Sequence, residues 1–116
     1  MASFFIPYPP SVNNYWGFHG HRRYLTPKAK QFKDKVSEII IENQVPKFGT
    51  NKLEIEICLY PPDKRTRDID NSIKSCLDAL CQAGVFDDDS QIDVLIVQRG
   101  EVYKGGKAEV RIEILL

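Results

Sequence analysis

Five aspartates of this sequence fall in two short stretches, with basic residues around the first of them. The stretches are "RTRDIDNSIK" (65–74) and "FDDDSQ" (86–91). The acids are Asp68, Asp70, Asp87, Asp88 and Asp89. Clustered carboxylates suit a hard divalent ion such as Mg²⁺, because Mg²⁺ takes oxygen ligands in an octahedron and keeps some of its water. The same arrangement suits a phosphodiester that is cut beside such an ion.

Each stretch also has an ordinary structural explanation. An aspartate at a helix start often accepts a backbone hydrogen bond, which would account for Asp68. Asp70 precedes Lys74 by four residues, and an exposed salt bridge at this spacing contributes only about 0.3–0.5 kcal/mol. The second stretch is equally compatible with a solvated turn whose aspartates act as caps. Residue types and spacing alone leave these alternatives open.

The chemical explanation requires the two stretches to meet. If the turn at 86–91 packs against the start of the helix that follows Arg67, three carboxylates converge and a cation becomes their natural counter-ion. Such an ion polarises a phosphoryl oxygen, promotes formation of a hydroxide nucleophile and stabilises the leaving oxygen. Lys74 would orient the attacking water or offset charge in the transition state. The pattern therefore predicts metal-assisted hydrolysis of a phosphodiester.

The distribution of charge indicates a nucleic-acid partner. The formal net charge is +0, but without those five aspartates eleven acidic residues face sixteen basic ones, a balance of +5. Basic residues neutralise backbone phosphates, and aromatic residues stack on bases. The candidate DNA contacts are Tyr15, Trp16, Arg22, Arg23, Lys64, Arg65 and Arg67. For the aromatic residues, core packing or a partner contact is the competing explanation.

Length and composition indicate one domain, residues 1–116, of an ordinary globular protein. The chain has 42% hydrophobic and 28% charged residues. No apolar run approaches the roughly 20 residues that span a membrane, and "MASFFIPYPP" lacks the features of a signal peptide. We therefore expect a cytoplasmic protein with no membrane association and no organic cofactor. The three cysteines form no C-x-x-C pair, which argues against a disulfide framework or a structural zinc site.

Hydrophobic periodicity predicts an α+β fold. The expected elements are a strand at 3–7, an exposed loop at 11–24, a helix at 26–43, a strand at 52–60, a helix at 68–84, and strands at 92–103 and 107–115. Thr26 is a natural N-cap, and Gly84 fits a C-terminal cap. "KGGK" (104–107) resembles the turn of a hairpin between the last two strands. The order β-α-β-α-β-β predicts a small mixed β-sheet with two helices packed on one face, and free sheet edges are compatible with a homodimer.

The chain resembles the RusA-type Holliday-junction resolvases, which phages and prophages often carry. The blocks that carry the resemblance are "PPSVNNYW", "PPDKRTRDIDNSIKSCLDAL", "GVFDDDSQI" and "KGGKAEVRIEI", in order along essentially the whole chain. The resemblance implies a homodimeric, Mg²⁺-dependent endodeoxyribonuclease. Such an enzyme binds four-way branched DNA and resolves it by paired symmetrical nicks during DNA recombination and repair. We expect Mn²⁺ to substitute for Mg²⁺.

The resemblance also implies roles for individual residues. The essential carboxylates of the family motif correspond to Asp68, Asp70 and Asp89, and the required lysine corresponds to Lys74. Asp88 matches the first acid of the "DDxQ" block and is a supporting metal ligand. Asp87 stands where an apolar residue is usual, and no role is assigned to it. Two alternatives remain: a nuclease with broader specificity for branched DNA, and a non-catalytic branched-DNA-binding protein.

Overall fold

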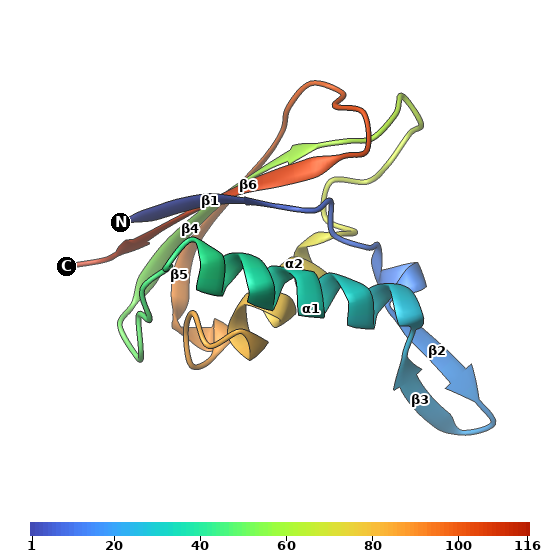
Figure 1. Ribbon diagram of the computed structural model, residues 1–116, viewed down its shortest axis with the longest axis horizontal. Helices are drawn as coiled ribbons and strands as arrows, with labels where there is room; N and C mark the ends of the chain where they lie inside the picture. Colours follow the sequence, from blue (N-terminus) through green and yellow to red (C-terminus); the bar gives the residue numbers. More distant parts are fainter.

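The computed structural model describes all 116 residues as a four-stranded sheet with two helices on one face and a separate two-stranded hairpin (Figure 1). The elements are β1 (Ala2–Ile6), the 3₁₀ turn η1 (Val12–Asn14), β2 (Trp16–His19), β3 (Arg22–Leu25), α1 (Pro27–Glu42), β4 (Leu53–Tyr60), α2 (Ile73–Gln82), the 3₁₀ turn η2 (Asp89–Gln91), β5 (Ile92–Arg99) and β6 (Lys107–Ile114). The predicted α+β class, with two helices and a mixed sheet, is confirmed. Neither α1 nor α2 has the length and the apolar composition that a membrane-spanning helix needs.

The core lies between the sheet and the two helices. It is one cluster of 19 buried residues. The strict alternation of β4 places Leu53, Ile55, Ile57 and Leu59 on the covered face, as the sequence predicts. The predicted stripe of α1 is buried at Ala29, Phe32, Val36 and Ile40, while Ile39 is only partly buried. Burial of this apolar area, at about 25 cal/mol per Å², fixes both helices against the sheet.

The helix caps follow the sequence signals. Thr26 is the N-cap of α1, where its side chain accepts a hydrogen bond from the backbone N–H of Ala29 at 3.2 Å. Gly84 follows α2 with a φ of 82°, a conformation that glycine adopts without a steric penalty. The Gly84 N–H donates to Cys81 and the Val85 N–H donates to Leu80, which satisfies carbonyls at the helix end.

The last two strands do not form the predicted hairpin. The strand order is β1-β6-β4-β5, so that β4 separates β5 from β6. β5 pairs with β4 in parallel, and β6 pairs with the other edge of β4 in antiparallel. The crossover through α2 brings β5 back parallel to β4, which leaves the other edge of β4 for β6. The turn signal at 104–107 was genuine, but it lies in a connection between strands that are not neighbours.

The segment 11–24 is not the exposed loop that the sequence predicts. It contains η1, all of β2 and the first three residues of β3, and Figure 1 shows the hairpin projecting beyond α1. A two-residue turn at 20–21 with Gly20 first, at a φ of 65°, joins the strands. Gly17 permits their close approach, since a Cβ there would lie 2.3 Å from the Tyr24 ring. Mixed aromatic and basic residues hid the strand alternation in the sequence.

The second helix begins later than predicted, at Ile73 rather than Asp68. Residues 69–72 form turns, and the backbone carbonyl of Asn71 accepts a hydrogen bond from Val12 at 2.8 Å. The Ser75 hydroxyl donates to the carbonyl of Pro10 at 2.6 Å. These contacts bind the entry of α2 to the N-terminal segment. As a result, Ile69 lies outside the buried helix stripe and is 39% exposed.

Candidate metal and DNA site

The first turn of α2 and the acidic turn at 86–91 meet through one lysine. Lys74 Nζ lies 3.2 Å from Asp89 Oδ2 and 3.2 Å from Asp78 Oδ1. The hydrogen bonds to Asp89 and Asp78 raise the pKa of Lys74. An ammonium group is therefore held between two carboxylates. The structure thus brings together Lys74 and Asp89, two of the residues that the sequence places in one site.

A buried glutamine amide holds the acidic turn in shape. Gln91, 6% exposed, accepts hydrogen bonds from the backbone N–H groups of Asp87 at 3.0 Å and Asp88 at 2.9 Å. Its amide nitrogen donates to the carbonyls of Gly49 at 2.8 Å and Asn51 at 2.6 Å. Both ends of the side chain are fully used. Gln91 therefore fixes the turn that carries Asp89 against a distant loop of the chain.

Asp88 serves this turn as a cap. Its Oδ2 accepts a hydrogen bond from the Ser90 N–H at 3.0 Å, in a capping box completed by Gln91. Hydrogen bonds from Ser90 lower the pKa of Asp88. The predicted capping role of an acid in this turn is therefore present. Asp88 is exposed, so its carboxylate remains accessible to a cation.

Asp68 and Asp70 are exposed, and their carboxylates have no hydrogen-bond or ion-pair partner in the chain. Only their backbone carbonyls are used, as acceptors for Asn71 and Ile73. The salt bridge considered between Asp70 and Lys74 does not form. Asp70 lies in the turns before α2, whereas Asp78 lies on the helix itself, four residues after Lys74. Both carboxylates are thus free to bind a ligand.

The three expected metal ligands do not form one cluster within a single chain. No group of three or more His, Cys, Asp or Glu side chains is placed to hold a metal ion. Asp89 is engaged by Lys74, while Asp68 belongs to a segment that borders a groove next to α1. The donor set nevertheless fits Mg²⁺ or Mn²⁺ chemically, because it consists of carboxylate oxygens and two of its members are unpaired.

The basic loop before Asp68 is ordered by one aspartate. Asp63 Oδ1 accepts hydrogen bonds from Arg67 Nη1 at 2.8 Å and from the Arg65 N–H at 2.9 Å. The hydrogen bond from Arg67 is the largest cause that lowers the pKa of Asp63 to about 2. Arg99 also donates to the Arg67 carbonyl at 2.6 Å. Arg67 is therefore partly enclosed, whereas Lys64 and Arg65 remain exposed.

Of the two aromatic residues expected to contact DNA, Tyr15 is unavailable for base stacking because it is 1% exposed. Burial, more than the charge of Asp78, raises the pKa of Tyr15 to about 12. The Tyr15 hydroxyl has no hydrogen-bond partner, so Asp78 contributes to the raised pKa through its charge. Core packing, the competing explanation for the aromatic residues, accounts for Tyr15.

The hairpin displays the other expected contacts. Trp16 is half-buried, and the Arg23 guanidinium lies 3.9 Å from its ring centroid. Arg22 is exposed beside it in the strand. Phe18, 70% exposed, and Tyr24, 48% exposed, add aromatic surface to the same hairpin. The β2–β3 hairpin therefore combines cations with accessible rings.

Three supporting residues were not anticipated: Asp63, Asp78 and Gln91. Asp78 could have been found from its four-residue spacing to Lys74 on a predicted helix. Gln91 stands in the "DDxQ" block, but the carbonyls that its amide contacts belong to residues 49–51, about 40 positions earlier. Nothing in the local sequence indicates that contact.

Comparison with known proteins identifies the group to which these features belong. The family model of endodeoxyribonuclease RusA matches residues 7–115. The crossover junction endodeoxyribonuclease of Enterobacteria phage HK97 is 38% identical over 109 residues, covering 94% of this chain and 91% of the phage protein. Those of Enterobacteria phage 82 and Escherichia coli K12 are 34% and 35% identical, each covering 92% of this chain and 89% of the relative.

Replacing Gln91 by leucine is expected to loosen the acidic turn. The change leaves the Asp88 N–H and the Asn51 carbonyl without partners, whereas the Asp87 N–H and the Gly49 carbonyl keep their own hydrogen bond at 3.2 Å. Each such group left unpaired costs about 1–3 kcal/mol. We expect the free energy of unfolding to fall by at least about 2 kcal/mol, as measured by urea denaturation. Gln98→Leu is the control, because Gln98 is exposed and its side chain hydrogen-bonds only to Glu56. Equal stability of the two variants would contradict the structural role of Gln91.

The low pKa of Asp63 predicts a specific pH dependence of stability. Because its pKa in the fold is about 2, below the ordinary 3.8, the ionised carboxylate stabilises the fold above about pH 4, and this contribution disappears as the pH falls through about 2. The difference in free energy of unfolding between wild type and Asp63→Asn should therefore be small and constant from pH 5 to 7. It should disappear as the pH falls to about 2. Urea midpoints across this range measure it. Asp34→Asn removes a carboxylate without a partner, so its stability relative to wild type should not change over this pH range.

Proposed function

The chain belongs to the endodeoxyribonuclease RusA family, and from this premise we propose that it resolves Holliday junctions during DNA recombination and repair. The reaction is hydrolysis of one phosphodiester in each of two symmetry-related strands, with a divalent cation. One observation carries the proposal most directly. Lys74 is held against Asp89 at 3.2 Å, at the entry of α2, where the free carboxylates of Asp68 and Asp70 follow a basic loop.

Mg²⁺ is the proposed cation, and Mn²⁺ is expected to replace it. Asp68, Asp70 and Asp89 would hold the ion, and Asp88 would support them. When bound, the ion supplies Lewis-acid polarisation of the phosphate, a more acidic water and stabilisation of the leaving oxygen. Mg²⁺ sites in such enzymes often use one or two carboxylates together with water and substrate phosphates, so the DNA can supply ligands that a single chain does not.

Lys74 has two proposed tasks. Its ion pair with Asp89 keeps that carboxylate turned toward the entry of α2. Its positive charge also lies where negative charge would develop on the phosphoryl oxygens, and a fixed cation in that place stabilises the transition state. Asp78 holds the lysine from the other side at 3.2 Å, which limits the directions that the ammonium group can take.

The DNA grip is proposed to come from two surfaces. Lys64, Arg65 and Arg67 place positive charge immediately before Asp68, where they can contact phosphates on either side of the cut. The projecting β2–β3 hairpin offers Arg22 and Arg23 in its second strand and the half-buried Trp16 at its base. Exposed rings on a projecting ribbon can stack on unpaired bases at a branch point.

A homodimer would match the symmetry of the substrate. Two copies related by a two-fold axis carry two equivalent sites, and these can cut two strands of a four-way junction with the same symmetry. The four-stranded sheet ends in β1 and β5, whose outer edges have no strand partner in the chain. Such edges leave backbone groups available for pairing with another molecule.

Asp70→Asn is expected to separate binding from catalysis. The carboxylate has no partner within the chain, so its removal should leave the fold and junction affinity unchanged. Cleavage should fall by at least about 100-fold. Single-turnover cleavage of a labelled four-way junction and a gel-shift assay measure the two properties. Asp93→Asn, an exposed acid paired with Lys52, should cut normally. A wild type that binds but never cuts would instead favour the non-catalytic alternative.

Divalent ions should differ in their effect on cleavage. We expect activity with Mg²⁺ or Mn²⁺ and little with Ca²⁺, because Ca²⁺ takes more ligands in a looser geometry. Rates with each ion, followed by an excess of chelator and then by restored Mg²⁺, measure this dependence. Full cleavage in chelator would overturn the assignment of the carboxylates to a metal.

The substrate preference distinguishes a resolvase from a broader nuclease. Four-way junctions should be cut at paired symmetrical positions, while three-way, flap and linear duplex DNA should be cut slowly. Nicks mapped on labelled strands at equal enzyme concentration measure this preference. Similar rates on all four substrates would contradict the resolvase assignment and indicate a nuclease of broad substrate specificity.

A further inference from the structure

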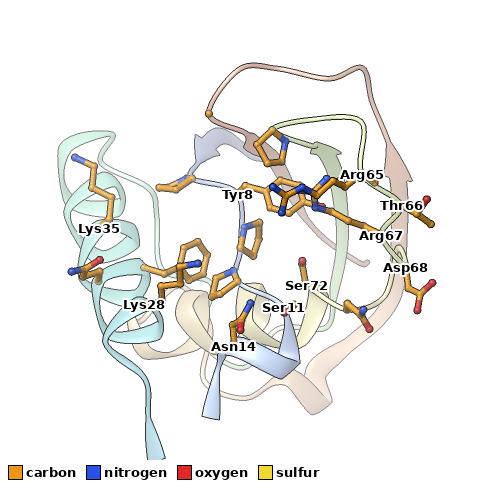
Figure 2. A pocket seen from close by; sticks show the side chains of 18 residues that line it. Tyr8, Ser11, Asn14, Lys28, Lys35, Arg65, Thr66, Arg67, Asp68 and Ser72 are labelled. Atoms are coloured by element: carbon orange, nitrogen blue, oxygen red, sulfur yellow. Dashed lines mark hydrogen bonds between the residues drawn. The ribbon is translucent and has the colours of Figure 1, made fainter. Parts of the chain in front are cut away.

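A groove lies directly beside Asp68, between α1 and the segment 62–72. Its volume is about 770 Å³, and its lining includes residues from α1, the loop 62–72 and the segment 7–11 (Figure 2). This volume falls within the range of about 300–1,000 Å³ found for pockets that bind small organic molecules. It suits about one or two nucleotides and is too small for a duplex. None of the roles described above uses its α1 wall.

The charge of the groove favours an anion. Its lining has four cationic side chains and one carboxylate, that of Asp68. Lys28 and Lys35 project from α1 on one side, and Arg65 and Arg67 lie on the other (Figure 2). Arg67 is already bound to Asp63, and Lys35 lies 3.5 Å from Glu38. Lys28 has no acidic partner, so its charge is available to a phosphate.

The walls also carry groups suited to the edges of bases. Asn14, Gln31 and Asn71 line the groove, and none of their side-chain amides makes a hydrogen bond within the chain. Each amide offers both donors and acceptors, which a base edge requires. The Tyr8 ring also lines the groove, with the Arg67 guanidinium 5.9 Å from its centroid. Such a ring can stack on a base of any sequence.

From these features we propose that the groove receives about one or two unpaired nucleotides of the cut strand, next to the scissile phosphate at Asp68. Lys28 contacts the backbone phosphate, and Gln31 bonds to the edge of the base. This inference rests on the proposed function and extends it. Drawing a base out of its stack costs free energy, and this cost is lowest where base pairing is weak, as at a branch point. Occupation of the groove would therefore favour cleavage at branch points.

The test combines the removal of a DNA base with the removal of a groove side chain. Four-way junctions are prepared in which one nucleotide has lost its base and keeps its sugar and phosphate. This abasic position, called the gap below, is moved through each nucleotide around the branch point. Affinities are measured by fluorescence anisotropy in Ca²⁺, which avoids cleavage. One gap position should weaken wild-type binding by about tenfold. The same gap should weaken Gln31→Ala by clearly less, about threefold, because the base-edge contact is already absent while stacking on Tyr8 is still lost.

Two lysines of α1 provide matched variants. Lys28→Ala should weaken intact and gapped junctions alike and lower the dependence of log affinity on log salt by about one. Lys30→Ala is the control, because Lys30 is exposed on the same helix but does not line the groove. All these positions are exposed, so circular dichroism should show an unchanged fold.

The inference fails if no gap position weakens wild type, or if the gap affects Gln31→Ala as strongly as wild type. It also fails if Lys28→Ala is indistinguishable from Lys30→Ala. These outcomes are independent of cleavage. A wild type that shows the expected coupling but never nicks a junction would overturn the proposed function and leave the groove assignment standing.

Discussion

The contact between Lys74 and Asp89 is the interaction on which the candidate site depends. The lysine side chain is 59% exposed, and an exposed ion pair contributes only about 0–1 kcal/mol to stability. Its importance is therefore positional. The buried partners on each side hold it in place: Leu77 and Leu80 fix α2 against the sheet, and the Gln91 amide fixes the acidic turn. The stable core thus supports a weak contact whose geometry carries the proposed chemistry.

Local concentrations of charge decide what the surface can bind. The formal net charge of the chain is +0, yet four cationic side chains face a single carboxylate around the groove. Five of the sixteen acidic residues are gathered instead in the two short stretches near α2. Potential in a cleft depends on nearby charges more than on the total, because salt screens interactions beyond about 8–10 Å. A neutral protein can in this way present a basic path that leads to an acidic site.

The aromatic residues near the N-terminus divide between two tasks. Tyr15 is buried and its ring lies 5.1 Å from that of Trp16 in an edge-to-face arrangement. Packing of this kind secures the base of the β2–β3 hairpin against the body. Phe18 and Tyr24 lie further out on the hairpin and remain exposed. One short segment therefore contains both the buried ring that packs at the base of the hairpin and the exposed rings further out.

The sequence by itself determined the elements whose signals are local. Periodicity identified α1, β4 and the buried face of each, and Thr26 and Gly84 marked helix ends, because caps and amphipathic patterns involve residues within a few positions of one another. The family motif likewise pointed to Asp68, Asp70, Lys74 and Asp89. Only the tertiary structure decided that β4 separates β5 from β6, that Tyr15 is inside, and that Lys74 pairs with Asp78 and Asp89 rather than Asp70. Each of these depends on contacts between segments far apart in the chain, where many pairings are compatible with the same local pattern and the packing of the whole core selects one.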